Sequence, residues 1–111
     1  MNTASTEYKT AVKIAALNDV ARSNAFNYMA TRGVMSLDEV VISDIFVAIQ
    51  EFSNFTEDND PYGEHDFGSF TVAGNKVFWK IDYYQQDLSG GCDPLDLDCR
   101  RVLTIMLAEE Y

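Results

Sequence analysis

Apolar residues recur at three- and four-residue steps in two stretches of the N-terminal half, and this spacing predicts two helices. The first is expected over residues 5–27. The second is expected over residues 37–53, and the preceding Ser36-Leu37-Asp38-Glu39 has the form of a capping box. Between the two helices, residues 27–34 break the helical period and indicate a short strand that ends in a turn.

The C-terminal half instead alternates apolar and polar residues, which is typical of strands with one solvated face. Residues 69–84 contain two β-rich runs on either side of Gly74-Asn75, a pair that tolerates the backbone angles of a two-residue hairpin turn. Pairing across that turn places Phe70 opposite Trp79 on the expected core face. A nearly continuous apolar run over residues 101–107 predicts a third, central strand, with a short helix as the alternative.

These elements predict a single α+β domain over residues 1–111, with two N-terminal helices packed on a small antiparallel sheet. The sheet consists of the hairpin, about residues 69–84, and the strand at about residues 101–107. Trp79 and Tyr83 are expected in the core. Lys80, Asp82 and Tyr84 are expected on the other face of the hairpin, where they are better candidates for function.

Charge is the strongest compositional signal, because 18 acidic and 8 basic residues give a formal net charge of −10. The excess falls in residues 51–98, which hold eleven acidic residues and only two basic ones, Lys76 and Lys80. Such a surface repels nucleic-acid phosphates and attracts cations or basic protein surfaces. We therefore expect a basic protein partner and no direct nucleic-acid binding.

The remaining bulk features point to the cytoplasm. No apolar run approaches the ~18 residues of a membrane span, and the N-terminus lacks the layout of a signal peptide. A cytoplasmic protein without membrane contact is expected. Cys92 and Cys99 are expected to stay reduced there, with a disulfide that closes the small loop between them as the open alternative. Two cysteines without a nearby histidine make a poor zinc site.

The segment FTEDNDPYGEHDFG, residues 55–68, carries five carboxylates and the only histidine of the chain. A metal site is one interpretation, but an EF-hand alignment starting at Asp58 puts Tyr62 and Ser69 where ligands are needed. No cofactor is predicted, although a divalent metal stays open. Its candidate ligands are Asp58, Asp60, Glu64, His65 and Asp66.

Two further interpretations of this segment need no metal. His65 lies between Glu64 and Asp66, and with Asp82 these groups are candidates for acid–base catalysis. Alternatively, Asp and Asn side chains bond nearby backbone amides, so the DNDPYG stretch is also consistent with a rigid structural loop.

The last interpretation is a charged surface that docks on a basic partner. Its candidate residues are the loop carboxylates together with polar residues on the solvated face of the hairpin: Asp58, Asp60, Glu64, Asp66, Lys80, Asp82 and Tyr84.

Three stretches, FTEDNDPYGEHDFG, VFWKIDYY and RVLTIMLAEEY, resemble in order and spacing the pattern of a bacterial domain-of-unknown-function family. LNDVAR at residues 17–22 is similar to its N-terminal LND-x-x-R motif, and TRGV at residues 31–34 also fits. The sequence departs from the pattern before TRGV, where a Gly-rich run is missing, and at CDPLDLDC. Members are small stand-alone proteins, often encoded on plasmids and other mobile elements, and the family carries no established activity.

The favoured hypothesis is therefore a small acidic binding module. The mobile-element association implied by the resemblance extends it to an inhibitor that occludes the nucleic-acid-binding surface of a host defence complex. The alternative is a small metal-binding protein or hydrolase-type enzyme that uses Glu64, His65 and Asp66. Arg22, within LNDVAR, is a candidate to reach the acidic loop and hold it, and the oligomeric state stays open.

Overall fold

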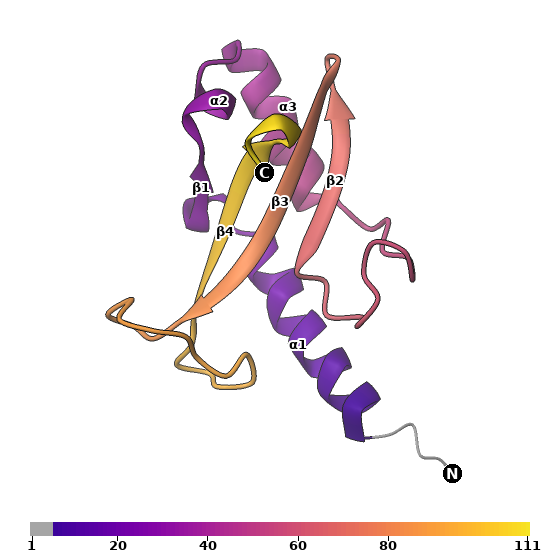
Figure 1. Cartoon of the computed structure of the whole chain (residues 1–111), viewed down its shortest axis with the longest axis vertical. Helices are drawn as coiled ribbons and strands as arrows, with labels where there is room; N and C mark the ends of the chain where they lie inside the picture. Colours follow the sequence, from indigo (N-terminus) through magenta and orange to yellow (C-terminus); the bar gives the residue numbers. More distant parts are fainter. Residues whose placement is uncertain (1–5) are drawn as a thin grey trace.

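A computed structural model describes residues 6–111 as an α+β fold, in which a four-stranded sheet carries helices on one face (Figure 1). The elements, in chain order, are α1 (Thr6–Arg22), the 3-10 turn η1 (Ala25–Asn27), β1 (Tyr28–Ala30), α2 (Arg32–Met35), α3 (Glu39–Gln50), β2 (Phe67–Val72), β3 (Asn75–Tyr84), β4 (Arg100–Leu107) and η2 (Ala108–Glu110). The predicted helical start at Ser5 lies outside the described residues.

The sheet has the strand order β1-β4-β3-β2, so β4 is central, as the sequence predicts. The prediction of a purely antiparallel sheet is wrong in one respect, because β1 runs parallel to β4. The chain leaves β1, forms both later helices and the hairpin, and only then returns as β4. A crossover of that length allows a parallel pair, whereas a tight hairpin would require an antiparallel one.

The hairpin turn lies one residue earlier than predicted. Ala73 and Gly74 occupy it with φ values of 51° and 79°. Phe70 therefore pairs with Val77 rather than with Trp79. This register differs from the predicted one by two residues, and because side chains alternate with a period of two, every residue stays on its predicted face.

The observed register places Gly68 opposite Trp79. A Cβ atom on Gly68 would lie 2.4 Å from Trp79 Nε1, so the indole fills the space that the missing side chain leaves. The predicted register would have set Phe70 against Trp79 on the same crowded face. Packing of the indole therefore accounts for the register, at the cost of a left-handed Ala73.

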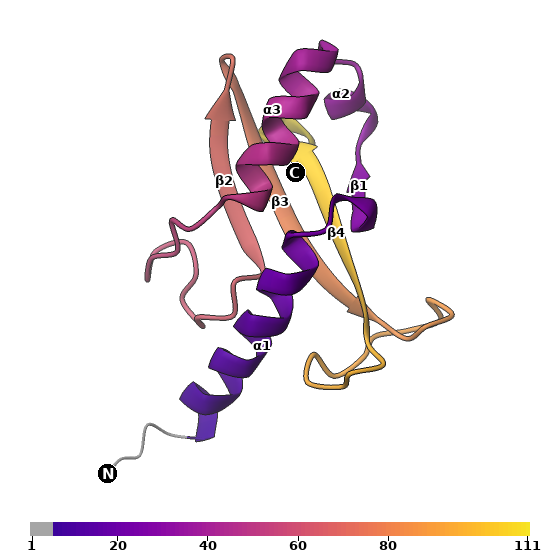
Figure 2. The same cartoon turned by 180° about the vertical axis from the view of Figure 1, so that it is seen from behind.

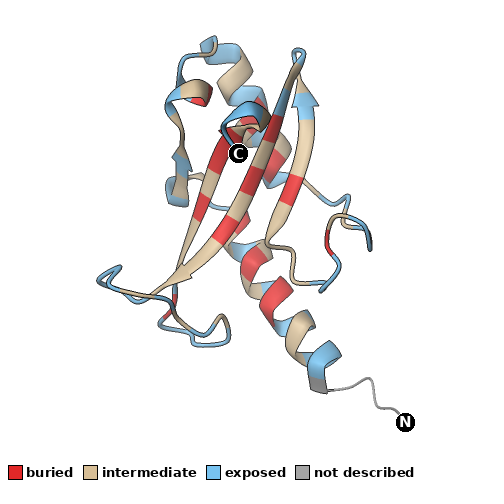
Figure 3. Cartoon of the chain, viewed as in Figure 1, coloured by how far each residue is buried: buried red, intermediate tan, exposed pale blue. Residues whose placement is uncertain are grey.

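The core lies between the sheet and the two long helices, α1 and α3, which cross the same face (Figure 2). Buried positions form a band along β3 and β4 (Figure 3). Ile45 and Ile49 of α3 are buried, and Phe46 and Phe52 pack against the buried cluster. The buried cluster consists of Val34, Ile45, Ile49, Val77, Trp79, Ile81, Leu103 and Ile105.

Both helices are shorter than predicted. The first ends at Arg22, and the second begins at Glu39 without a capping box, since Asp38 makes no side-chain cap bond. Ser36 instead ends α2, and its hydroxyl donates to the Gly33 carbonyl at 2.8 Å. Ser36, the residue expected to cap the second long helix, therefore lies at the end of the additional short helix α2. No helix within residues 6–111 has the length and apolarity to cross a membrane.

The C-terminal turn η2 is joined to α2 through Glu110. The Thr31 hydroxyl donates to Glu110 Oε1 at 2.6 Å and the Gly33 amide to Oε2 at 3.1 Å. Hydrogen bonds from Thr31 and from the Leu107 amide lower the pKa of Glu110. A Cβ on Gly33 would approach the carboxylate to 2.6 Å. Thr31 and Gly33 of the TRGV stretch therefore contact Glu110 of the C-terminal AEEY stretch.

Candidate functional site

The acidic loop, which we define as residues 55–66, leads from α3 to β2 and lies beside α1 (Figures 1 and 2). Two side chains of α1 hold it there. Asn18 Nδ2 donates to the Glu64 carbonyl at 2.9 Å, and Asp19 Oδ1 lies 2.9 Å from His65 Nδ1. The LNDVAR stretch of α1 is therefore the surface on which the loop is built.

Asp60 organises the backbone of the loop from inside. It is only 8% exposed, and its Oδ1 accepts the amides of Glu64 at 3.1 Å and His65 at 3.2 Å. Its own amide donates to the Thr56 carbonyl at 2.8 Å, and the Gly63 amide donates to its carbonyl at 3.0 Å. This part of the segment is the rigid structural loop that its composition allows, and the Asp60 carboxylate faces inward.

His65 is fixed on three sides. Its ring stacks on Phe55, with centroids 3.8 Å apart and planes only 3° from parallel. Besides the Asp19 contact, its Nε2 lies 3.8 Å from Asp60 Oδ2. The backbone at His65 adopts a left-handed φ of 56°, which is uncommon for a residue with a side chain and which turns the ring toward α1.

Arg22 supports this arrangement from beneath, as the sequence suggests. Its guanidinium lies over the ring of Phe55 in the loop, 5.2 Å from the centroid, and it also acts through Asp19. Its buried guanidinium donates to Asp19 Oδ1 at 2.8 Å and to the Phe52 carbonyl at 3.1 Å. Although burial works to raise it, the pKa of Asp19 is lowered by hydrogen bonds from Arg22 and His65. Asp19 thus stays charged between two donors.

A second buried group, Asn18, connects the loop to the sheet. Its side chain is fully buried; Nδ2 also donates to the Tyr83 hydroxyl at 2.8 Å, and Oδ1 accepts from Arg101 Nε at 2.8 Å. Burial raises the pKa of Tyr83 to about 12, so this phenol remains protonated at neutral pH. All three side chains therefore hold fixed positions beneath Glu64.

Glu64 and Asp66 are the half-buried carboxylates of the site. Burial, followed by the negative charges of Asp66 and Asp60, raises the pKa of Glu64. Burial also raises the pKa of Asp66, with further contributions from Asp60 and Asp82. Neither carboxylate belongs to an ion pair formed within the described chain. This end of the molecule therefore carries a fixed, uncompensated negative potential.

The predicted residues of the hairpin lie elsewhere. Lys80 and Asp82 form an ion pair of 3.1 Å on the sheet face opposite the core, on the same side of β3 as Tyr84. His65 packs on the helical side through Phe55 and Asp19. The structure therefore does not bring Asp82 and His65 together, and the seven candidate partner-binding residues fall into two groups. Of the candidates in the acidic loop, Asp58 is exposed, Glu64 and Asp66 are half-buried, and Asp60 is buried.

The same geometry bears on whether these side chains could bind a metal ion. Over residues 6–111, no group of three or more His, Cys, Asp or Glu side chains is arranged to hold an ion. His65 and Asp60 are engaged with Asp19 and with backbone amides. Cys92 and Cys99, at the β3–β4 connection, are both free thiols.

Asn18 and Asp19 take part in the site, although the sequence analysis assigns no role to either. One signal was available. Ile14, Asn18 and Arg22 follow one another at four-residue steps on α1, and all three are buried. Polar residues on the core-facing stripe of a helix need partners, so they point to a network beneath.

One comparison with known proteins identifies the chain. A family model described as "Protein of unknown function (DUF3768)" matches residues 30–110. The chain belongs to this family. The match begins at Ala30, the last residue of β1, and covers the acidic loop and strands β2, β3 and β4. It starts after α1, so the LNDVAR residues lie outside it. Neither a curated protein nor a solved structure gives a significant match.

Proposed function

We propose that this member of the family is a small binding module that docks its acidic loop on a basic surface of a partner protein. The observation that carries the proposal is the Glu64–Asp66 pair. Both carboxylates are half-buried, repel one another, and lack a cationic partner among the described residues. A lysine- or arginine-rich surface would supply the missing charge.

The rigidity of the loop supports the same proposal. Asp60 fixes the amides of Glu64 and His65, and Asn18 fixes the Glu64 carbonyl. A surface that is already ordered loses little conformational entropy on binding, so more of the electrostatic attraction appears as affinity.

The proposal includes an inhibitory consequence. Where the partner surface normally grips nucleic acid, a docked carboxylate array competes for the same lysines and arginines. For a protein carried on a mobile element, a host complex that binds nucleic acid would be the expected partner. Inhibition would then be competitive with DNA or RNA.

The test is a comparison of two triple variants in capture from host lysate at low and at high salt. The loop variant is Asp58→Asn, Glu64→Gln, Asp66→Asn, which keeps the structural Asp60. The matched control, Glu39→Gln, Asp44→Asn, Glu51→Gln, removes the same number of charges from α3 and the residue after it. We expect wild type and control to retain one partner that is released by high salt and by added duplex DNA, and the loop variant to lose it.

Equal capture by the loop variant and the control, with both variants folded by circular dichroism, would contradict the proposal. A captured partner that duplex DNA does not displace would contradict the proposed inhibition of nucleic-acid binding.

A second candidate function rests on the same pair. Two coupled carboxyl groups with raised pKa values beside a protonated tyrosine resemble the acid–base sites of hydrolases. Native mass spectrometry with calcium, magnesium, manganese and zinc distinguishes the two candidates. One retained ion per chain, lost in an Asp66→Asn variant, would favour the metal-dependent enzyme over the binding module.

A further inference from the structure

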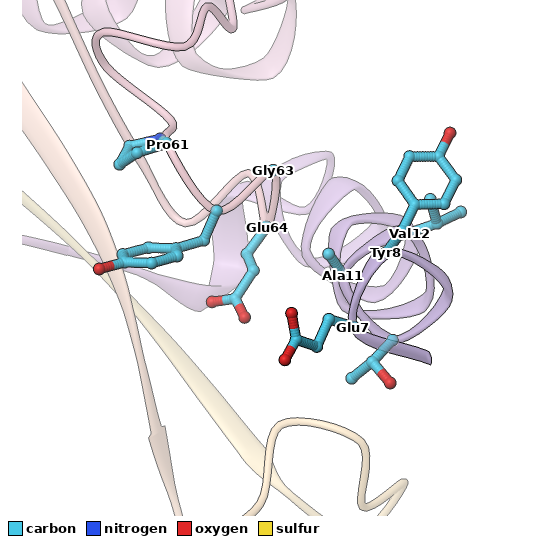
Figure 4. A pocket seen from close by; sticks show the side chains of 9 residues that line it. Glu7, Tyr8, Ala11, Val12, Pro61, Gly63 and Glu64 are labelled. Carbon is cyan, nitrogen blue, oxygen red and sulfur yellow. The ribbon is translucent and has the colours of Figure 1, made fainter. Parts of the chain in front are cut away.

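A pocket of about 690 Å³ lies between the first turns of α1 and the turn of the acidic loop (Figure 4). One wall is formed by α1, where Ala11 and Val12 supply apolar surface. The other is formed by Pro61, Tyr62 and the backbone of Gly63. The pocket is therefore a mainly apolar groove between two segments that are far apart in the sequence.

Two carboxylates enter this groove from opposite walls. Glu7 projects from α1 and Glu64 from the loop, and Figure 4 shows their carboxylates turned toward one another. None of the residues that line the groove is a lysine, arginine or histidine. An exposed carboxylate, Glu7, and a half-buried one, Glu64, that face the same groove favour a cation between them.

The kind of cation follows from the walls. A bare metal ion needs several oxygen ligands in a tight shell, and no such group occurs over residues 6–111. The apolar walls and the Tyr62 ring suit an organic cation with a carbon stem instead. A guanidinium fits two carboxylates and an aromatic wall better than an ammonium, because it is planar, carries five donors and stacks on rings.

We propose that this groove binds an arginine side chain of a protein partner, held between Glu7 and Glu64 with its stem against the apolar walls. This inference rests on the proposed function, which it extends from a charged surface to a defined pocket. The loop wall is already in place, because Asp60 accepts the Glu64 amide at 3.1 Å and Asn18 donates to the Glu64 carbonyl at 2.9 Å. Gly63 provides the left-handed φ of 69° that the turn requires.

The test uses ¹⁵N-labelled full-length protein and three nine-residue peptides that differ at one central position: arginine, lysine or citrulline. Citrulline has the shape of arginine without its charge. We expect the arginine peptide to shift the amides of Ala11, Val12, Gly63 and Glu64. The affinity of the citrulline peptide should be lower by about tenfold or more, since it loses charge-assisted hydrogen bonds. The affinity of the lysine peptide should be intermediate.

Two double variants locate the binding. Glu7→Gln with Glu64→Gln removes both carboxylates of the groove and should lower arginine-peptide affinity about tenfold or more. Glu51→Gln with Glu57→Gln removes the same charge from exposed positions outside the groove and should leave the affinity within about twofold. Equal binding of the arginine and citrulline peptides, or shifts confined to other amides, would overturn the inference.

Glu7→Gln alone separates this inference from the proposed function, because Glu7 lies outside the acidic loop. If Glu7→Gln binds the peptide and captures the partner like wild type, while the triple loop variant loses the partner, the arginine pocket is wrong and the binding module stands. If the triple loop variant also keeps the partner, both are wrong.

Discussion

At the scale of single residues, surroundings rather than chemical type decide what each carboxylate does. Asp58 and Asp60 are two positions apart in the same loop, yet Asp58 is exposed and Asp60 is 8% exposed. Asp60 accepts two backbone amides, whereas Asp58 faces solvent. Asp60 therefore belongs to the structure of the loop, and Asp58 belongs to its surface.

Replacing Asp60 with Asn should destabilise the protein by about 1–3 kcal/mol. The neutral amide loses the charge that strengthens the bonds from the Glu64 and His65 amides, and its NH2 group cannot accept the His65 amide as Oδ2 does. Asp58→Asn should stay within about 0.5 kcal/mol of wild type. Urea unfolding followed by tryptophan fluorescence measures both. Equal stability of the two variants would show that Asp60 does not organise the loop.

At the scale of elements, the hairpin register depends on one small residue facing one large one. Gly68 lies on β2 opposite Trp79, and the fully buried indole occupies the space over it. This pair sets how β2 continues from the acidic loop, and so where Asp66 emerges. The orientation of the site therefore depends on packing inside the hairpin.

Gly68→Ala should be destabilising by about 1–3 kcal/mol, because its Cβ would meet Trp79 Nε1 at 2.4 Å in a packed core. Gly90→Ala is the matched control, since a Cβ there meets nothing within 4 Å, and we expect a change within about 0.5 kcal/mol. Thermal unfolding by circular dichroism gives the comparison. A Gly68→Ala protein as stable as the control would contradict the proposed cause of the register.

At the scale of the whole molecule, whose net charge is −10, some acidic residues have a cationic partner and others do not. Asp19 has a buried arginine and His65 as partners, and Asp82 has Lys80. Glu64 and Asp66 have no such partner in the described chain, and their raised pKa values show that folding works against their charge. The charges of Glu64 and Asp66 therefore reduce the stability of the folded protein at neutral pH.

This imbalance predicts a pH dependence with a definite sign. Since the folded state raises the pKa of Glu64 and of Asp66, it binds their protons more tightly than the unfolded state, and both groups reduce stability at neutral pH. A Glu64→Gln, Asp66→Asn variant should be more stable than wild type at pH 7. The difference should shrink as the pH falls toward about 4, where carboxyl groups protonate in the unfolded chain as well.

Urea midpoints of both proteins between pH 7 and pH 4 measure this difference, with Asp44→Asn on α3 as the control. Asp19 acts in the opposite sense, because its lowered pKa provides stability that is lost only as the pH falls through that lowered value. If the stability difference between variant and wild type is the same at every pH, the charges of Glu64 and Asp66 are not what destabilises the folded protein.

Periodicity and composition determine a large part of this protein. The three- and four-residue steps of α1 and α3, the alternation of β3 and the apolar run of β4 define the α+β class, the core faces and the central strand, because burial of one face imposes these patterns locally. The clustering of carboxylates also identifies the acidic loop.

The tertiary structure decided the rest, because the deciding contacts join distant parts of the chain. The register followed from Trp79 packing over Gly68. The parallel placement of β1 followed from a crossover rather than from any local signal. The roles of the acidic residues followed from the groups around them. Asp60 accepts the amides of Glu64 and His65 and so holds the loop together, whereas Glu64 and Asp66 have no cationic partner within the described residues.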